Sequence, residues 1–346
     1  MSSSEAPSPV LVIGGAGYLG RNLALALLKR GDTVRVFDRH VPKDELATHP
    51  GVQCITGDLR NPYDVSRAVE GCQTVFHAAS MICALTLAPR ALREQVEAVN
   101  VKGTRHVLDA CLAHGVTRLV YTSSINVVPV PTDGGDETRR YHLSPLADLY
   151  SRTKAQAERM VLASDTEGGL RTCALRPGGI YGPGEEHHFP RFIKELKAGK
   201  MIVGLGDGKT RADNVYIDDL VSAHIHAADR LGPDTRIGGQ AYFITDGEPQ
   251  HYFQFFRPAV EGLGHKMPRV NLPGPVLIGL AWVSEVVHYA GGPWPFTTVM
   301  EAGKLVKENW VHIDRARRDL EWSPEVSHAE GMRRSMPYIQ ALYDAS

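Results

Sequence analysis

The amino-acid sequence predicts a doubly wound α/β fold, in which helices cover both faces of a parallel sheet. Short apolar runs alternate with longer amphipathic stretches from Val10 onward, and a glycine-rich turn follows the first run. Runs that are apolar throughout are typical of parallel strands, because helices bury both faces of such a sheet. Strands separated by helices favour right-handed βαβ crossovers.

The first half of the chain supplies the strands and helices of this sheet in order. We expect strands at residues 10–13, 33–37, 52–55, 74–76, 118–122 and 171–175, and helices at 18–30, 91–114 and 149–162. In the first helix, leucines recur at helical spacing and Gly31 provides a C-terminal stop.

The pattern changes after Arg176, where glycine and proline become dense between residues 177 and 184. We therefore divide the chain into a nucleotide-binding domain, 1–176, and a smaller C-terminal substrate-binding lobe, 177–214 and 246–346. Residues 215–245 are expected to return to the first domain, as a helix at 217–231 and a strand at 241–245.

The composition limits the classes of partner and compartment. The 346 residues are 43% hydrophobic and carry a formal net charge of −1, with basic residues spread along the chain, so no nucleic-acid partner is expected. Five cysteines without a CxxC pair indicate reduced thiols, and the polar N-terminus lacks the apolar stretch of a secretory signal. We therefore expect a cytoplasmic protein. The histidines lack partners at ligand spacing, so no metal site is predicted.

The turn after the first strand has the features of a dinucleotide-binding site. Residues 14–20 read Gly-Gly-Ala-Gly-Tyr-Leu-Gly. Gly14 permits a tight turn, Gly17 lets the backbone approach a pyrophosphate, and Gly20 lets the helix pack closely on the sheet. The helix that begins at Tyr18 and Leu19 offers unpaired amide groups and a positive dipole end to the phosphates. The motif predicts a Rossmann-type cofactor site.

Asp38 follows the second strand and would select the cofactor. A carboxylate there accepts hydrogen bonds from the adenosine ribose and repels a 2′-phosphate, which favours NAD over NADP. An ordinary turn aspartate is the alternative interpretation. Arg21 and Arg39 could tolerate a 2′-phosphate, which keeps NADP open as the less favoured cofactor. Further cofactor contacts are predicted after the next two strands, at Asp58, Leu59, Ala78 and Ala79.

A candidate catalytic set combines Ser124, Tyr150 and Lys154. Tyr150 and Lys154 lie one turn apart at the start of a predicted helix, so their side chains share a face. A nearby ammonium favours the phenolate and lets the tyrosine accept a proton from a hydroxyl. Ser124 follows a strand, at the sheet edge where ligands of such folds bind, and could orient the reacting oxygen. A helix-capping role for Ser124, or the use of Ser123 instead, is the alternative.

These residues together resemble the extended short-chain dehydrogenase/reductase superfamily, and longer motifs resemble its 3β-hydroxysteroid dehydrogenase/isomerase branch. That branch includes sterol-4α-carboxylate 3-dehydrogenases (decarboxylating). The motifs that carry the resemblance are Val99-Asn-Val-Lys-Gly-Thr104, Leu175-Arg-Pro-Gly-Gly-Ile-Tyr-Gly182, Gly239-Gln-Ala-Tyr-Phe-Ile-Thr-Asp246 and Ala316-Arg-Arg-Asp-Leu320.

The resemblance implies an NAD-dependent oxidation of a 3β-hydroxysteroid or sterol, with Ser124, Tyr150 and Lys154 as the catalytic triad. It places Asn100 near the active site and Pro177 near the nicotinamide. Isomerisation or loss of a C4 carboxylate could follow the oxidation. Tyr242 and Asp246 could match residues assigned to isomerisation in this branch, but Gly247 stands where a second acid would be. A nucleotide-sugar epimerase or dehydratase is the enzymatic alternative.

The segment 276–290 is the most apolar stretch of the predicted substrate lobe. It is too short to span a bilayer, and Glu285 interrupts it. It could pack on the core of the lobe, or it could form an apolar wall for a hydrophobic small-molecule substrate and rest on a membrane surface. A homodimer is left open.

Overall fold

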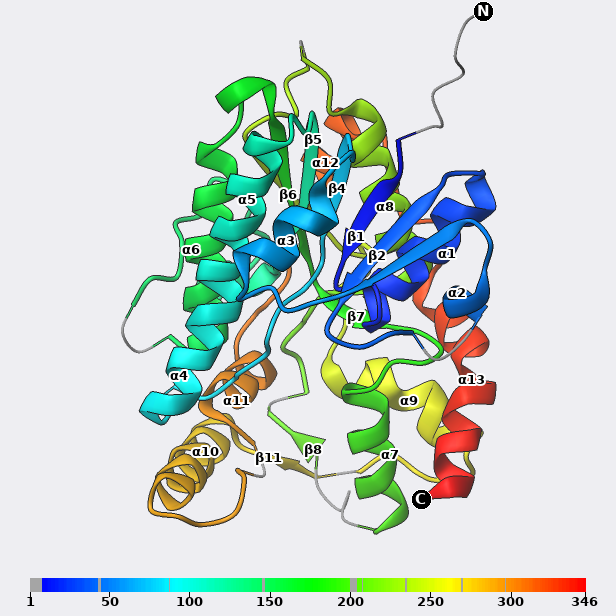
Figure 1. The fold of residues 1–346 in the computed structure, drawn as a ribbon. Helices are drawn as coiled ribbons and strands as arrows, with labels where there is room; N and C mark the ends of the chain where they lie inside the picture. Colours follow the sequence, from blue (N-terminus) through cyan, green and yellow to red (C-terminus); the bar gives the residue numbers. More distant parts are fainter. Residues whose placement is uncertain are drawn as a thin grey trace, which may run out of the picture.

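The computed structural model describes residues 8–42, 45–86, 88–144, 147–199, 204–206, 208–233, 235–268, 270–295 and 297–346. Its centre is a seven-stranded sheet in the order β10-β6-β5-β4-β1-β2-β3, in which all neighbouring strands are parallel. The predicted doubly wound α/β fold is therefore confirmed (Figure 1). The strands are β1 (Val10–Ile13), β2 (Val34–Asp38), β3 (Val52–Thr56), β4 (Thr74–His77), β5 (Arg118–Thr122), β6 (Arg171–Pro177) and β10 (Gln240–Ile244).

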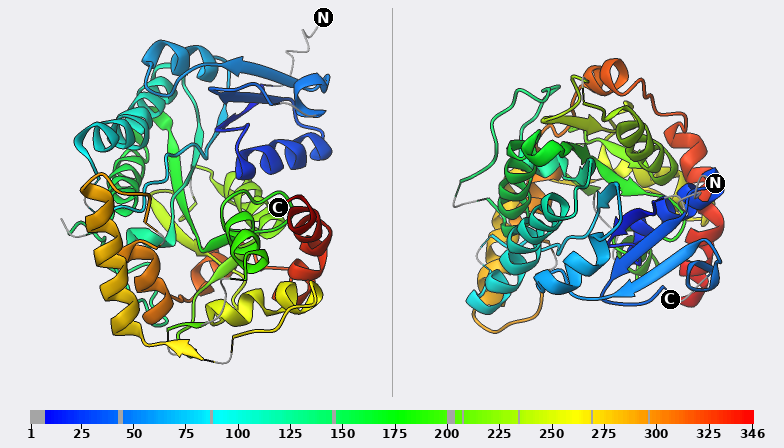
Figure 2. Two further views of the ribbon diagram at one scale, coloured as in Figure 1. Left: turned by 90° about the horizontal axis from the view of Figure 1, so that it is seen from below. Right: turned by 45° about the horizontal axis from the view of Figure 1, so that its top comes forward.

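Helices cover both faces of the sheet (Figure 2). One face carries α3 (Pro62–Val69), α4 (Arg90–Glu97), α5 (Gly103–Ala113) and α6 (Leu149–Ala163), and the other carries α1 (Tyr18–Arg30), α8 (Ile217–Arg230) and α12 (Asp314–Asp319). Alternate residues of each strand enter one of two buried clusters. In β5, for example, Val120 packs toward α1 and α8, whereas Leu119 packs toward α3 and α5.

The single helix expected at residues 91–114 is wrong in detail. The structure has α4, then a π turn at Ala98–Lys102, and then α5. A π turn inserts one extra residue and changes the direction of the side chains that follow, and such turns are frequent at functional sites. Gly103 directly follows the turn. It has no room for a side chain, because a Cβ there would lie 2.6 Å from Cγ of Leu59. No local sequence pattern distinguishes this turn from continuous helix.

The strands run downward in Figure 1, so their carboxyl ends face a group of helices below the sheet. These are α7 (His188–Lys197), α9 (Tyr252–Gly262), α10 (Gly274–Tyr289) and α11 (Val299–Val306). Short parallel pairs join them, β7 (Gly179–Tyr181) with β9 (Asn214–Tyr216), and β8 (Gly204–Leu205) with β11 (Asn271–Leu272). The chain closes with α13 (His328–Ala345), beside α7 and α9; α2 (Glu45–Thr48) follows β2.

The helix α10 is apolar on its exposed side as well as on its buried side. Only Leu277, Ala281 and Glu285 are buried, and Glu285 is fully inaccessible to solvent. The outward side chains are apolar and exposed: Val276, Leu280, Trp282, Val283, Val286 and Val287. A purely core-packed helix was one of the two expectations for this segment, and the exposed face departs from it. Within the described ranges, no helix is both long enough and apolar enough to cross a bilayer.

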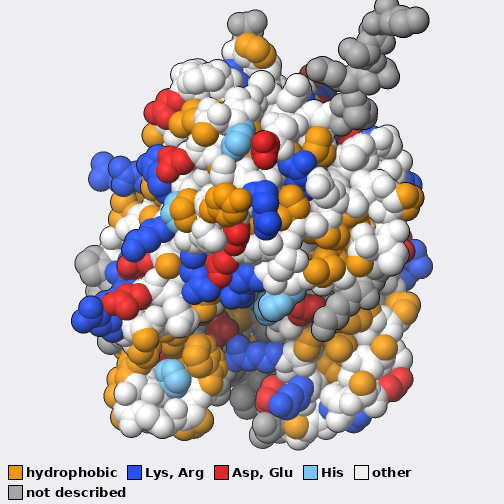
Figure 3. All heavy atoms as spheres, viewed as in Figure 1, with side chains coloured by type: hydrophobic (Ala, Val, Ile, Leu, Met, Phe, Trp, Pro, Cys, Tyr) orange, Lys and Arg blue, Asp and Glu red, His pale blue; other side chains and the backbone are white. Residues whose placement is uncertain are grey.

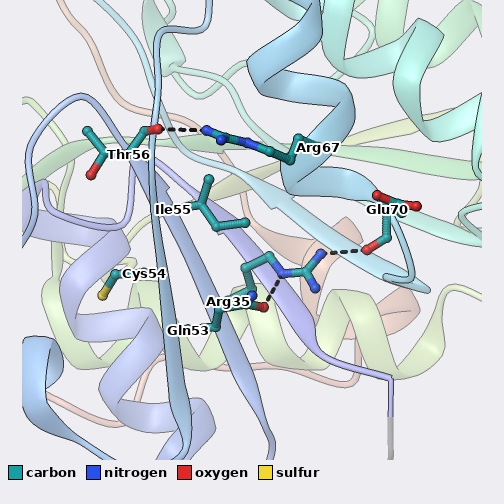
Figure 4. Close-up of a pocket in the computed structure, with 7 residues that line it drawn as sticks. All are labelled: Arg35, Gln53, Cys54, Ile55, Thr56, Arg67 and Glu70. Carbon is teal, nitrogen blue, oxygen red and sulfur yellow. Dashed lines mark hydrogen bonds between the residues drawn. The ribbon is translucent and has the colours of Figure 1, made fainter.

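The two edges of the sheet are treated differently. A loop covers the β10 edge, where the Glu137 carboxylate accepts a hydrogen bond from Phe243 N at 2.9 Å. A pocket of about 560 Å³ opens beside β3, the opposite edge strand (Figure 4). Arg67 donates there to the Thr56 carbonyl at 3.1 Å, and Arg35 donates to the Glu70 carbonyl at 2.5 Å. These bonds fix backbone at the sheet edge, and the residues predicted for catalysis do not line this pocket.

Candidate active site

The glycine turn between β1 and α1 has no room for side chains. Gly14 has a φ of +84°, and a Cβ there would lie 2.7 Å from the backbone nitrogen of Ala79. A Cβ on Gly20 would collide with the carbonyl oxygen of Gly14. The turn therefore lies tightly between the ends of β1 and β4, the two strands at which the chain changes direction across the sheet.

The N-terminus of α1 has the open amide groups that a pyrophosphate requires. Gly17 occupies the N-cap position, is exposed, and has no side chain to cap the helix, and the first turn holds no acid. These features fit a dinucleotide. Tyr18 and Leu19 could contribute only through their backbones, because Leu19 is buried in the core and the Tyr18 hydroxyl faces Gly182. Burial raises the pKa of the Tyr18 phenol.

Asp38 lies at the end of β2, beside the glycine turn. Its carboxylate accepts hydrogen bonds from Ala16 N at 3.1 Å and from His40 N at 3.3 Å. Arg39 is exposed, and Arg21 forms an ion pair with Glu45 at 3.4 Å. The carboxylate is thus held at the turn, where a ribose would lie.

Asp58, which is predicted to contact the adenine, already pairs with a neighbouring arginine. Its carboxylate forms an ion pair with Arg60 at 2.5 Å, and these hydrogen bonds lower the pKa of Asp58. Leu59 is buried under α5, against Gly103. An adenine amine would therefore share the Asp58 carboxylate with the guanidinium of Arg60.

The remaining predicted cofactor residues lie along the same carboxyl edge. Ala78 N donates to the Ile13 carbonyl at 3.0 Å, and Ala79 faces Gly14. Pro177 is buried at the end of β6, where it pairs with Ile244 of β10. Small or rigid residues therefore surround the space above the glycine turn.

Tyr150 and Ser124 meet at the ends of α6 and β5. The hydroxyls of Ser124 and Ser80 are hydrogen-bonded to the Tyr150 phenol and favour its ionised form, but burial is the larger effect and raises the pKa of Tyr150 to about 12. Ser124 also caps a short 3₁₀ turn, since its Oγ accepts from Asn126 N at 3.2 Å. Its hydroxyl proton is free to be donated, so the capping role and contact with Tyr150 coexist.

Ser123 lies elsewhere. The structure therefore distinguishes the two serines that were candidates to orient the reacting oxygen. Its backbone nitrogen donates to the Leu175 carbonyl at 2.6 Å, inside the sheet. Its hydroxyl is buried with no hydrogen-bond partner within the described ranges. Ser124, and not Ser123, is therefore next to Tyr150.

Lys154 follows Tyr150 by one turn of α6 and is fully buried. Its side chain is 1% exposed, and Nζ donates to the Thr122 carbonyl at 2.5 Å and lies 4.2 Å from the centre of the Tyr121 ring. Burial lowers the pKa of Lys154 to about 7, and the Glu158 carboxylate one turn later on α6 opposes that change. Burial raises the pKa of Tyr121, and the charge of Tyr150 acts in the same direction.

Asn100 stands in the π turn and orients the loop that holds Ser80. Its Oδ1 accepts from Met81 N at 2.7 Å, and its Nδ2 donates to the Met81 carbonyl and to Thr153 Oγ1, both at 3.0 Å. Analysis of the sequence did not identify Ser80, the carbonyl of Thr122 or the role of Asn100 in holding the loop. The only available signal was Ser80 itself, directly after the two small residues at the end of β4.

Tyr242 and Asp246 are distant from this set. Tyr242 points from the middle of β10 toward α12, where the Arg315 guanidinium lies 5.5 Å from its ring, on the sheet face opposite α6. Asp246 is 7% exposed, and burial next to Asp213 raises its pKa to about 8. Among residues that the structure describes, no group of three or more His, Cys, Asp or Glu side chains is arranged to hold a metal ion.

An apolar cluster adjoins Tyr150 on the side of α10. Cys83, Leu85, Val96 and Leu149 form it, and Tyr289 of α10 packs against it. The loop after β4 is tied to the start of α6, because Tyr150 N donates to the Cys83 carbonyl at 3.0 Å. Figure 3 shows a hollow below the sheet, between the region of α10 and α11 and that of α7.

Comparison with known proteins places the chain in a family. Residues 11–274 match the model of the 3-beta hydroxysteroid dehydrogenase/isomerase family. Short-chain dehydrogenase/reductase family 42E member 1 from Danio rerio is 40% identical, over 95% of this chain and 88% of that protein. A 3-beta-hydroxysteroid dehydrogenase from Mycolicibacterium neoaurum is 38% identical, over 97% and 92%.

A solved structure shows the same fold at lower identity. The UDP-glucose 4-epimerase of Thermus thermophilus, in complex with NAD, superposes with a TM-score of 0.72 at 22% identity, over 96% of this chain and 99% of that one. That likeness establishes the fold alone. The family model and the relatives of high coverage go further, and the chain belongs to the 3-beta hydroxysteroid dehydrogenase/isomerase family of oxidoreductases.

Proposed function

We propose that this protein oxidises the 3β-hydroxyl of a steroid or sterol to the 3-ketone. The observation that carries the proposal is the convergence of Ser124, Tyr150 and Lys154 beside a glycine turn that fits a dinucleotide. NAD is the cofactor that the family and the turn support. Family membership supports the substrate class, and one relative is itself named 3-beta-hydroxysteroid dehydrogenase.

The cofactor would lie across the carboxyl edge of the sheet. The backbone of the glycine turn would hold the pyrophosphate, Asp38 the ribose, and Asp58 with Leu59 the adenine. Ala78 and Ala79 would line the middle of the cofactor, and Pro177 and Lys154 would approach its nicotinamide half. NAD, when bound, accepts the hydride that leaves C3 of the substrate.

Residues of the chain itself accept the proton of the substrate hydroxyl. Ser124 donates a hydrogen bond to the substrate oxygen and fixes its direction. Tyr150 accepts the hydroxyl proton as the C–H bond breaks and the C=O bond forms. With the pKa of Tyr150 near 12, ionisation needs a nearby positive charge. Lys154, when protonated, supplies that charge from the same face of α6.

An apolar wall and a polar cluster fit a steroid better than a sugar nucleotide. The wall is the partly exposed side chain of Tyr289, backed by the buried cluster of Cys83, Leu85 and Leu149 next to Tyr150. Burying apolar ring surface against it stabilises a steroid by roughly 25 cal/mol per Å². We propose that residues 177–214 and 246–346 form the substrate-binding lobe around this wall. Coupled isomerisation has weaker support, because Tyr242 points to the opposite face of the sheet.

We also propose a peripheral contact between α10 and a lipid surface. Six apolar side chains of α10 are exposed together, and its one carboxylate, Glu285, is turned inward. Aromatic residues such as Trp282 and Trp294, which are 39% and 59% exposed, favour the boundary between lipid and water. A hydrophobic substrate would then reach the apolar wall directly from the lipid.

The central test measures NAD reduction with purified protein and 3β-hydroxysteroids, sterols and their C4-carboxylated forms. We expect activity with a 3β-hydroxysteroid and a much slower reaction with the 3α epimer, whose C–H bond faces away from the hydride acceptor. UDP-glucose is the negative control. Activity with UDP-glucose and with none of the 3β-sterols would show that the steroid assignment is wrong.

Tyr150→Phe should lower kcat by roughly 10²–10⁴-fold, the usual contribution of a general acid or base, and leave NAD binding intact. Stopped-assay turnover and quenching of protein fluorescence by NAD measure the two effects separately. Ser124→Ala and Ser123→Ala form a matched pair, since only the first hydroxyl contacts Tyr150. Equal losses in the two serine variants, or near-normal turnover in the phenylalanine variant, would assign the proton transfer to other groups.

Asp38 sets the preference for NAD over NADP, because its carboxylate repels a 2′-phosphate. Asp38→Asn keeps an oxygen acceptor for Ala16 N and removes the charge. It should narrow the ratio of kcat/KM for NAD to that for NADP by about tenfold, equivalent to about 1.4 kcal/mol. Asp38→Ala should act in the same direction. A ratio near one in the unmodified protein would refute this role.

The lipid contact predicts co-sedimentation with liposomes. Leu280→Glu introduces a charge at a position that is 44% exposed, so it should release the protein from liposomes without changing its melting temperature. Tyr63→Glu is the matched control, since Tyr63 is 72% exposed on α3, far from α10. If the unmodified protein does not sediment with lipid, α10 is not a membrane contact.

A further inference from the structure

His224 is a fully buried histidine on α8, on the sheet face opposite the helix α6 that carries Tyr150 and Lys154. Its ring lies beside that of Phe76 of β4, with 6.3 Å between the ring centres. A buried imidazole is costly unless its polar atoms find hydrogen-bond partners. The two ring nitrogens of His224 have different partners, and one of them leads to the end of β5.

The partners of the two ring nitrogens identify the one that carries the hydrogen. Nδ1 lies 2.8 Å from the Leu220 carbonyl oxygen, one turn earlier on α8. A carbonyl oxygen only accepts hydrogen bonds, so Nδ1 is the protonated nitrogen. Burial lowers the pKa of His224 to about 4, and the ring is therefore uncharged at neutral pH. Nε2 is then an acceptor, and the Thr122 hydroxyl donates to it at 2.8 Å.

Thr122, the last residue of β5, joins the two faces of the sheet. Its hydroxyl bonds to His224 on the side of α8, whereas its carbonyl oxygen accepts from Nζ of Lys154 at 2.5 Å. The N–H of the same peptide unit belongs to Ser123 and donates to the Leu175 carbonyl at 2.6 Å. The peptide that binds the ammonium is therefore held by the neighbouring strand and by a side-chain anchor on the far face of the sheet.

The same strand end also carries the serine of the catalytic set. Ser124 follows Thr122 by two residues, and its hydroxyl is hydrogen-bonded to Tyr150. A displacement of Thr122 would therefore move the acceptor of the Lys154 ammonium and the neighbouring serine together. The anchor of Thr122 thus affects the part of the site on which proton transfer depends.

We propose that His224 is a positioning residue for Lys154: by accepting the hydroxyl hydrogen of Thr122, it holds the Thr122 carbonyl where that oxygen binds the ammonium. This inference rests on the proposed function, in which the protonated lysine supplies the charge that ionises Tyr150. His224 acts through Thr122 and not on the substrate or the cofactor. The alternative is that this hydrogen bond only stabilises the core between β5 and α8.

Thr122→Val keeps the branched shape of the side chain and removes the hydroxyl. A looser carbonyl contact disfavours the charged amine, so the pKa of Lys154, about 7 in the unmodified protein, should fall. Because the reaction needs the protonated amine, the alkaline limb of the kcat profile should move to lower pH by about 0.5–1 unit, as a weakened hydrogen bond to a charged group produces. The other groups around this ammonium remain in place: Glu158 on α6, His77 on β4 and the Tyr121 ring.

Thr172→Val is the matched control. Thr172 is also a buried strand threonine, and its hydroxyl donates to the Val161 carbonyl at 2.7 Å, but it lies near the amino end of β6, opposite Leu119. Its loss should lower the melting temperature and leave the pH profile in place. Thr122→Ser retains the hydroxyl and His224→Gln retains an acceptor oxygen, so both should keep most of the unmodified profile. His224→Leu should reproduce Thr122→Val, and it takes the place of that variant if the valine variant does not fold.

Two measurements on the full chain test the inference. One is kcat and KM for NAD reduction with a 3β-hydroxysteroid across pH, in which kcat should change and KM should not. The other is NMR of protein with isotope-labelled lysine side chains, which follows the pKa of Lys154 without turnover; Lys154→Met assigns the signal. A lower Lys154 pKa in Thr122→Val and not in Thr172→Val supports the inference.

An unchanged Lys154 pKa in folded Thr122→Val, or an equal shift in Thr172→Val, would overturn the positioning role and assign the hydrogen bond to stability alone. The proposed function fails separately, if the unmodified protein oxidises no 3β-hydroxysteroid. In that event the NMR titration still decides whether His224 acts on Lys154.

Discussion

The burial of one ammonium group constrains the region that holds the proposed catalytic residues. Lys154 is 1% exposed, and an isolated cation in such a place would cost several kcal/mol. The chain offsets the cost with the Thr122 carbonyl at 2.5 Å, the face of the Tyr121 ring and the carboxylate of Glu158. The first two contacts join α6 to β5, which carries Thr122 and Tyr121, whereas Glu158 lies one turn later on α6 itself. The contacts of Lys154 with β5 therefore fix how α6 packs against the end of that strand.

A second charge pair extends this constraint to the next strand. Glu158 is fully buried and accepts hydrogen bonds from Arg176 at 3.1 and 2.6 Å and from Tyr141 at 2.8 Å. Removing one partner of such a buried pair typically costs about 3–5 kcal/mol, because the other charge stays buried. Arg176 directly precedes Pro177, which is predicted to approach the nicotinamide. The same carboxylate thus acts on Lys154 and positions the strand end beside the cofactor site.

The parts of this arrangement that the sequence predicted are local ones. Strand ends, the glycine turn and the spacing of Tyr150 and Lys154 follow from runs of adjacent residues, and the observed strands agree with the expected ones to within two residues at their ends. The rest depends on contacts between distant segments. Ser80 lies next to Tyr150 because Asn100 holds the loop through Met81. The π turn that positions Asn100 has no local signature.

Glu285 shows how contacts between distant segments can bury a residue that the sequence pattern of its helix would place in solvent. In sequence it interrupts an apolar stretch, and it would be expected on the solvent side of a helix. In the structure it is fully buried, accepts from Val299 N at 2.8 Å and from Tyr289 Oη at 2.8 Å, and reaches Thr86 N at 3.4 Å. These bonds join α10 to α11 and to the loop after β4, on the side that faces Tyr150. Leu277, Ala281 and the polar bonds of Glu285 hold the inner face, and the other apolar residues of α10 remain outside. A helix with this polarity can serve as a wall of the substrate site on one side and face an apolar environment on the other.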